Sequence, residues 1–242
     1  MKRFAFLAGA LALFAIPSCI FIDDDPIGNC VNGKGDRVTQ VLDIPDFTGI
    51  ALATQAKVYI EQGATQKVEV TAQENIIELI KLDVQGGVWE IEFDHCAYDF
   101  STVEIYITVP DLDKVTNSSS GDIYGEGQFD VNSIDLVNTG SGDIEMDIKS
   151  ISIDATISGS GDMVMDGETQ NLDVVVSGSG DFEGFGLDSQ NADLTISGSG
   201  DIECTVTGQM DVTISGSGDV FYKGNPSIDV SITGSGKLID AN

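Results

Sequence analysis

Basic side chains are scarce in this sequence. Eleven Lys and Arg stand against 40 Asp and Glu, which gives a formal net charge of −29 at pH 7. Nucleic acids and anionic lipids repel such a chain, so we expect neither as a partner. The single His also leaves little material for acid–base chemistry that recurs along the chain. This composition favours a soluble surface that binds no polyanion, or one that attracts cations.

Cysteine is sparse as well, with four residues and no Cys-x-x-Cys pair or Cys/His spacing typical of a metal site. We therefore expect no metal chemistry through sulfur. Cys30 and Cys96 are a candidate disulfide, provided that the chain folds in an oxidising compartment. Cys204 lies in phase with Ile202 and Val206, which predicts a small buried hydrophobic residue.

The apolar run at the start of the chain is too short to span a membrane. Residues 4–16 make 13 positions, whereas a transmembrane helix needs about 20. The run follows Lys2 and Arg3, which predicts a secretory signal peptide over residues 1–18. The stretch Ile16-Pro17-Ser18-Cys19 resembles a lipobox, which implies that Cys19 carries the lipid that anchors the mature chain. An ordinary signal peptide with an unmodified Cys19 is the alternative.

Residues 19–37 are predicted to form an acidic tether, with three consecutive aspartates at 23–25. An acidic run directly after a lipidated Cys resembles the surface-export signal of some Gram-negative lipoproteins. It implies an outer-membrane lipoprotein, with exposure at the cell surface as a hypothesis. A solvated linker with no export role is the alternative.

Residues 38–113 have the alternation of half-buried strands without a repeat, which predicts an irregular β region. Trp89, Ile91 and Phe93, for example, alternate with polar residues. Gly86-Gly87 predicts a hairpin turn. One or two helical turns are expected within residues 74–82.

From residue 114 to 242 one five-residue pattern, Ser-Gly-Ser-Gly-Asp or a close variant, returns every 18–21 residues. Each copy lies between two strands with apolar residues on one face and polar residues on the other. Such a unit cannot bury its apolar face alone, so we expect equivalent strands to stack in parallel as an all-β β-helix with about 18–21 residues per rung. An antiparallel meander barrel is the rival, but it predicts alternating corner types. A variable turn is expected to return the chain between corners.

Two Asn side chains occupy inward positions of the first repeats, Asn117 and Asn138. Buried amides need partners, so we expect them to bond each other as an asparagine ladder, or else to be wetted at an open first rung.

The repeated five-residue pattern fits neither a phosphate-binding loop nor a nucleophile elbow, because the glycine spacing is wrong for both. Calcium is the stronger alternative, but its 6–8 oxygen ligands exceed what each copy offers. We therefore expect a structural corner, in which glycines adopt positive φ and let rungs approach closely, and the Asp caps backbone N–H groups in an Asx-type turn. We expect no cofactor, and at most a weak association of Ca²⁺ with the corner aspartates. These are Asp122, Asp143, Asp162, Asp181, Asp201 and Asp219, followed by Lys237 in the last copy.

Candidate catalytic groups are few. His95 with Asp94 and Asp99 is interpreted as a surface feature of a loop. A second column of aspartates on the strands lies where some β-helices cleave acidic polysaccharides, but no Arg or Lys accompanies it. Its members are Asp173, Asp193, Asp211 and Asp229.

The sequences FTGIALATQAKVYIEQG and VEIYITVPDLDKV, followed by serial SGSGDI units, resemble the auto-transporter adhesin, head GIN domain family of Gram-negative envelope proteins. The resemblance covers about residues 40–240 and implies a right-handed parallel β-helix. It supplies no catalytic motif. We therefore predict a non-enzymatic envelope lipoprotein that acts in adhesion or binds a glycan or protein ligand. A polysaccharide-active enzyme and a purely structural envelope protein are the alternatives.

Overall fold

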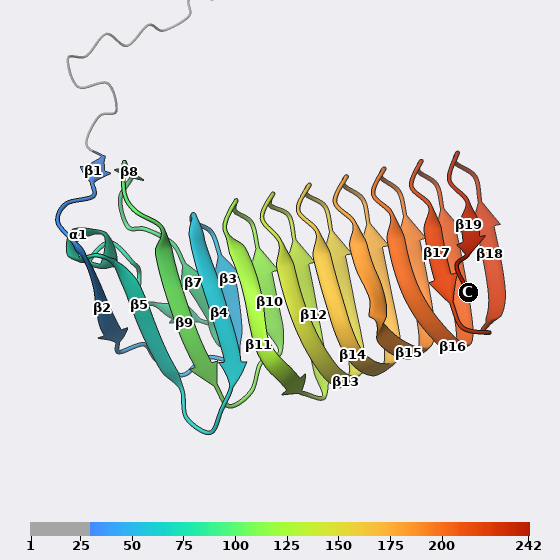
Figure 1. The fold of residues 1–242 in the computed structure, drawn as a ribbon, viewed down its shortest axis with the longest axis horizontal. Coiled ribbons are helices and arrows are strands. Elements are labelled where there is room, and N and C mark those ends of the chain that lie inside the picture. The colour runs from blue at the N-terminus through green and yellow to red at the C-terminus, as the bar shows by residue number, and fades with distance from the viewer. Residues whose placement is uncertain (1–29) are drawn as a thin grey trace, which may run out of the picture.

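The structure is a computed structural model and describes residues 30–242. Strands make up 62% of these described residues and helix 2%, and the strands form a β-solenoid of about 7 turns. The turns stack along one straight axis, with residue colours running in order through the repeat region (Figure 1). The predicted all-β solenoid is therefore confirmed.

The strands of the repeat region pair in parallel with their equivalents one turn away. Asp154, for example, lies beside Asp173, which lies beside Asp193. In chain order the strands are β10 (Lys114–Asn117), β11 (Asp122–Asp130), β12 (Ser133–Asn138), β13 (Ile144–Ile157), β14 (Met163–Val176), β15 (Phe182–Ile196), β16 (Ile202–Ile214), β17 (Val220–Lys223), β18 (Ser227–Ile232) and β19 (Leu238–Asp240).

The variable turns expected between corners are not separate turns in the middle of the stack. Strands β13 to β16 each run for 13–15 residues from one corner to the next. They bend on the way, and the register shifts between Val164 and Asp166 and between Gly184 and Asp188. Strands β13 and β14 keep one register throughout, so the bend itself requires no β-bulge, and pairing between turns continues through it.

The predicted inward residues form the core. Val176, Ile196 and Ile214, which precede successive corners, are fully buried. The last turn differs, since no later turn of the described chain covers it. The side chain of Val230 is 45% exposed, whereas Val212, its equivalent one turn earlier, is 3% exposed.

Parallel stacking does not start at residue 114. Strand β3 (Gly49–Leu52) lies between β7 (Val88–Ile91) and β10, and β4 (Ala56–Gln62) lies between β9 (Val103–Val109) and β11. The region predicted to be irregular, residues 38–113, therefore contributes two layers to the stack. The layer formed by β3 and β4 comes first in the sequence, but in space it lies between the layer of β7 and β9 and the first repeat.

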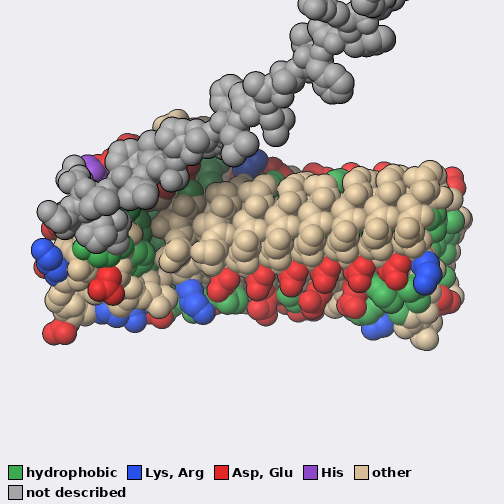
Figure 2. Space-filling view, turned by 90° about the horizontal axis from the view of Figure 1, so that it is seen from above, with side chains coloured by type: hydrophobic (Ala, Val, Ile, Leu, Met, Phe, Trp, Pro, Cys, Tyr) green, Lys and Arg blue, Asp and Glu red, His purple; other side chains and the backbone are tan. Residues whose placement is uncertain are grey.

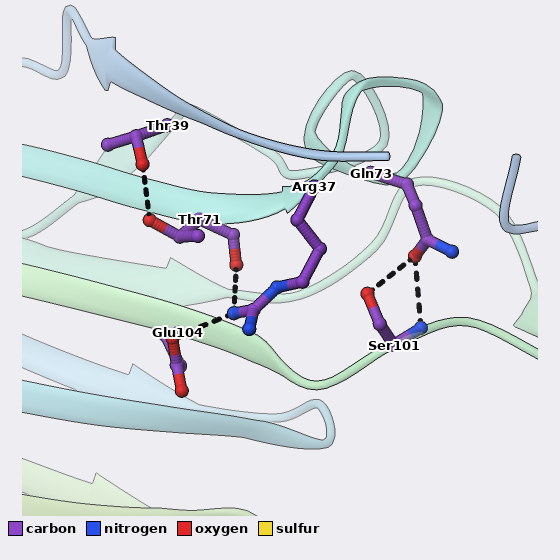
Figure 3. A network of polar contacts seen from close by, with 6 residues as sticks. All are labelled: Arg37, Thr39, Thr71, Gln73, Ser101 and Glu104. Atoms are coloured by element: carbon purple, nitrogen blue, oxygen red, sulfur yellow. Dashed lines mark hydrogen bonds and ion pairs between the residues drawn. The ribbon is translucent and has the colours of Figure 1, made fainter. Parts of the chain in front are cut away.

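An antiparallel cap closes the N-terminal end. Strand β2 (Arg37–Leu42) pairs with β5 (Lys67–Gln73), and β5 pairs with β9. The single helix α1 (Glu74–Ile77) lies within the predicted helical segment, and β6 (Val84–Gln85) forms a hairpin with β7 through the Gly86-Gly87 turn, as predicted. Arg37 ties the cap together, because its guanidinium donates to Thr71 O at 3.0 Å and to Glu104 Oε2 at 2.7 Å (Figure 3).

The last residues of the predicted tether lie against this body. Strand β1 (Val31–Asn32) pairs in parallel with β8 (Ala97–Tyr98), and β2 starts at Arg37. Cys19 and the predicted signal peptide lie outside the described residues. Between residues 30 and 242, no helix has the length and apolar character needed to cross a bilayer.

Candidate functional site

The glycines of the repeated corner are required by the close approach of successive turns. A Cβ atom at Gly159 would lie 1.9 Å from the carbonyl oxygen of Gly140, and one at Gly180 would lie 2.1 Å from that of Gly161. None of these corner glycines is among the described residues with positive φ, so the expectation of a left-handed backbone is wrong. Close packing between turns, the other part of the expectation, explains both glycines of the five-residue pattern.

The corner aspartates link one turn to the next. In each case Oδ1 accepts the backbone N–H of the equivalent residue one turn later, at distances from 2.7 Å to 3.3 Å. The expected Asx turn is therefore wrong, because the donor belongs to the following turn and not to the neighbouring residues. The reason is geometric: stacking at the usual spacing of about 4.8 Å brings each N–H under the preceding carboxylate.

This arrangement also explains Lys237. Its backbone N–H donates to Asp219 Oδ1 at 2.7 Å. No described turn follows it, so its side chain has no N–H to accept and the position does not need a carboxylate.

The two buried Asn side chains do not form a ladder. Asn117 Nδ2 donates to Gly121 O at 2.7 Å, and Asn138 Nδ2 donates to Gly142 O at 2.8 Å. Each amide therefore bridges its own corner. Both side chains are fully buried, so the wetted alternative is wrong too. An Asn–Asn bond does occur at the opposite bend, from Asn191 Nδ2 to Asn171 Oδ1 at 3.2 Å.

Seen from above the corners, the solenoid presents a ridge of backbone and small polar side chains, with a row of acidic side chains along one edge (Figure 2). No group of three or more His, Cys, Asp or Glu side chains within residues 30–242 is placed to hold a metal ion. The strand aspartates are also in register, from Asp173 through Asp193 and Asp211 to Asp229. Burial, with help from Asp193 and Asp154, raises the pKa of Asp173.

A cleft opens where the regular corners end. The first corner of the repeats packs directly on residues 53–57, since a Cβ at Gly121 would lie 2.2 Å from Ala56 O. Strands β3 and β4 are joined by only three residues, 53–55, whereas the connection from β7 to β9 takes 11 residues, 92–102. This longer loop does not fit as a corner, and it leaves a hollow of about 550 Å³ beside its neighbours.

The loop is fixed at both ends of the hollow. Cys30 and Cys96 are joined by a disulfide, and Val31 N donates to Cys96 O at 2.7 Å. Further along, Gln73 Oε1 accepts both the N–H and the hydroxyl of Ser101 at 2.9 Å (Figure 3). The predicted cysteine pair thus lies beside the cleft and holds its wall.

We call this hollow the cleft and define it by six of its lining residues: Lys57, Phe93, Tyr98, Asp99, Phe100 and Asp122. The rings of Phe93 and Phe100 meet edge to face, with centroids 5.6 Å apart and planes at 84°. Asp99 has a φ of 49° and is the one non-glycine residue with positive φ between residues 30 and 242. The volume of the cleft, about 550 Å³, lies within the usual range of small-molecule sites, about 300–1,000 Å³.

A column of tyrosines adjoins the cleft on the outer face of strands β9, β4 and β11. Tyr59 stacks between Tyr106 and Tyr124, with ring centroids 5.0 Å and 5.4 Å apart. The Tyr124 hydroxyl donates to Asp122 Oδ2 at 3.2 Å, and burial together with Asp122 raises the pKa of Tyr124 to about 12. The hydroxyl therefore stays protonated and holds Asp122 at the edge of the cleft.

The other candidate residues lie apart from the cleft. His95 Nδ1 is 3.0 Å from Asp94 Oδ2, both side chains are more than 60% exposed, and neither lines the cleft. Cys204 is fully buried, as predicted, and burial raises its thiol pKa to about 12, which makes it unreactive.

Sequence reasoning missed the cleft and the tyrosine column. A signal for the column was present, because Tyr59, Tyr106 and Tyr124 each lie two residues after a charged residue in the outward phase of a strand. The cleft had no such signal. Its residues come from three connections that become neighbours only through the layer order of the N-terminal region.

Stacked corners, an antiparallel cap and a lateral cleft define this molecule as a capped β-solenoid. The chain belongs to the family described as "Putative auto-transporter adhesin, head GIN domain", whose model matches residues 46–226. Membership indicates a cell-surface or envelope protein with an adhesion-like role.

Solved structures share the fold. A "putative adhesin" from Bacteroides fragilis NCTC 9343 is 23% identical, with a TM-score of 0.83, and the match covers 87% of this chain and 99% of that one. A "Putative lipid binding protein" from Parabacteroides distasonis ATCC 8503 is 23% identical, with a TM-score of 0.75 and coverage of 88% and 99%. A "putative adhesin" from Parabacteroides merdae ATCC 43184 is 22% identical, with a TM-score of 0.73 and the same coverage. No curated protein matches the chain.

Proposed function

We propose that this chain is a non-enzymatic module of the bacterial cell envelope that is anchored to the outer membrane by lipid on Cys19 and binds an external ligand in the cleft. Relatives named as adhesins support an adhesive role, and the lipobox-like sequence before Cys19 supports the anchor.

The observation that carries the proposal is the cleft itself. It interrupts a stack whose other corners are packed against each other, and its wall is fixed by a disulfide and by two hydrogen bonds that Ser101 donates to Gln73 Oε1. Its lining combines aromatic rings with a few charged groups, which is the usual composition of a binding site. His95, the one His of the chain, takes no part in this site, because it pairs with Asp94 outside the cleft.

Attachment of bacteria that express the full chain to mucin-coated surfaces tests this role. The double variant Tyr98→Ala/Phe100→Ala should reduce attachment to the level of a strain without the gene. Phe221→Ala, which removes a partly buried ring on the opposite end of the solenoid, is the matched control and should attach normally. Normal attachment of the cleft variant, at normal surface levels, would refute a binding role for the cleft.

The anchor and the enzymatic alternative need separate experiments. Labelled palmitate should enter the wild-type chain and not Cys19→Ala, and protease treatment of intact cells should remove the solenoid if it faces outward. Release of reducing ends from acidic polysaccharides, abolished by Asp193→Ala, would instead establish an enzyme.

A further inference from the structure

The charges that line the cleft do not cancel. Lys57 Nζ lies 3.9 Å from Asp122 Oδ2 and 5.9 Å from the ring centroid of Tyr124, so Asp122 offsets the cation. Asp99, an exposed residue of the same lining, takes part in no ion pair or side-chain hydrogen bond within the described part of the chain. One carboxylate at the cleft is thus left without a counter-charge.

The rest of the molecule strengthens this local excess. With 40 acidic and 11 basic residues, the protein has a strongly negative field, and a recess with low-dielectric walls concentrates such a field. A carboxylate or phosphate group would be repelled from the cleft, whereas a cation would be drawn into it.

The aromatic side chains specify which cation. Phe93, Tyr98 and Phe100 present ring surface to the cleft, beside oxygen atoms from Thr54, Gln55, Thr102 and Ser120. A metal ion needs several oxygen ligands to replace its water, and no group of three or more His, Cys, Asp or Glu side chains within residues 30–242 is placed to supply them. A methylated ammonium needs none, and it gains cation–π attraction from rings within about 6 Å.

We propose that the cleft binds a small organic cation with a methylated ammonium group, held by the Phe93, Tyr98 and Phe100 rings and by the Asp99 carboxylate. This inference rests on the proposed function, since it names the ligand class of the same cleft. The group could arrive as a free small molecule or as the headgroup of a zwitterionic lipid, which present the same chemistry.

Calorimetric titration of the full chain with choline and with 3,3-dimethylbutan-1-ol tests the charge. The alcohol has the same shape but a carbon in place of the nitrogen. Choline should bind about five- to thirtyfold more tightly, which corresponds to one or two cation–π contacts. Equal affinity for the two compounds, or no binding of choline, would overturn the proposal.

Variants in the same loop locate the site. Asp99→Asn should weaken choline binding at least about fivefold and leave the alcohol unaffected. Asp94→Asn is the matched control, because it removes the same charge from an exposed position outside the lining and should change little. Equal losses of choline affinity in both variants would show that the negative field of the whole protein attracts choline and that Asp99 forms no specific site. Tyr98→Phe keeps the ring and should bind choline normally. Together with the double variant Tyr98→Ala/Phe100→Ala, which removes two rings, it shows whether a loss of binding comes from the missing rings.

Vesicles distinguish the two sources. Binding to phosphatidylcholine vesicles and not to phosphatidylglycerol vesicles supports a lipid headgroup, whereas binding of choline alone supports a free ligand. If the cleft variants lose attachment to mucin but the wild type never binds choline, the ligand class is wrong and the proposed function stands.

Discussion

Replacing one corner glycine by alanine tests whether close packing of the turns holds the solenoid together. In Gly180→Ala the new Cβ would lie 2.1 Å from Gly161 O, and contacts under 3.0 Å are essentially never tolerated. The two turns must therefore separate by about 1 Å. That shift stretches the hydrogen bond from Ser179 N to Gly159 O, now 3.0 Å, beyond bonding distance.

The magnitude follows from these losses. The hydrogen bonds from Ser179 N and Gly180 N to Gly159 O together contribute about 1–3 kcal/mol, and overpacking costs about 1–3 kcal/mol more. Alanine recovers only about 0.4–1 kcal/mol by restricting the unfolded chain. We expect a net loss of about 2–5 kcal/mol in the free energy of unfolding, measured by urea denaturation followed by circular dichroism.

Ser179→Ala is the matched control for this experiment. It changes an exposed hydroxyl at the same corner and should stay within about 0.5 kcal/mol of the wild type. A Gly180→Ala variant as stable as this control would refute the explanation that the corner glycines are needed for close packing of the turns.

Four further predictions concern charge and covalent links. Asp181→Asn keeps an acceptor for Asp201 N–H and should be about 1–2 kcal/mol more stable to urea than Asp181→Ala; equal stability would contradict the link between turns. Burial and neighbouring carboxylates raise the pKa values of Asp173 and Glu183 above those of the unfolded chain. The folded state therefore binds protons more readily, and the melting temperature should rise as the pH falls from 7 to 5; a decrease would show that other groups dominate. Millimolar Ca²⁺ and Mg²⁺ should raise the melting temperature equally, and a larger effect of Ca²⁺ would indicate a specific site. Mass spectrometry without reductant should find Cys30 linked to Cys96, and a free thiol at both would contradict the clamp.

Periodicity was enough to predict the repeat region, because every turn buries its apolar face against an identical neighbour. The inward phase of Val176, Ile196 and Ile214 and the burial of Cys204 follow from the two-residue period of a strand. The N-terminal layer order could not be read in this way. Strands β3 and β4 insert between β7/β9 and β10/β11, and neither pairing leaves a local pattern in the sequence.

The corner shows why residue type alone misleads. Glycine suggested positive φ and aspartate suggested an Asx turn, which are the common local uses of these residues. In the structure both residues serve contacts with neighbouring turns, the glycine with the preceding turn and the aspartate with the next one, and these partners lie 18–21 residues away in the sequence. Gly180 accommodates the carbonyl of Gly161, and Asp181 accepts the N–H of Asp201.

The same contacts explain why a ligand site would lie at the capped end of the solenoid. In the repeats one oxygen of each corner aspartate is bonded to the next turn, and each glycine is covered by a carbonyl, so the corner has no recess. At residues 92–102 the long loop departs from that packing, and a disulfide and Gln73 fix it at a distance from the neighbouring corner. The result is a cleft lined by aromatic and polar residues, in which one of the two carboxylates, that of Asp99, is bonded to no other described side chain. The regular part of the chain supplies rigidity and negative charge, and the irregular part supplies the recess in which that charge can act on a ligand.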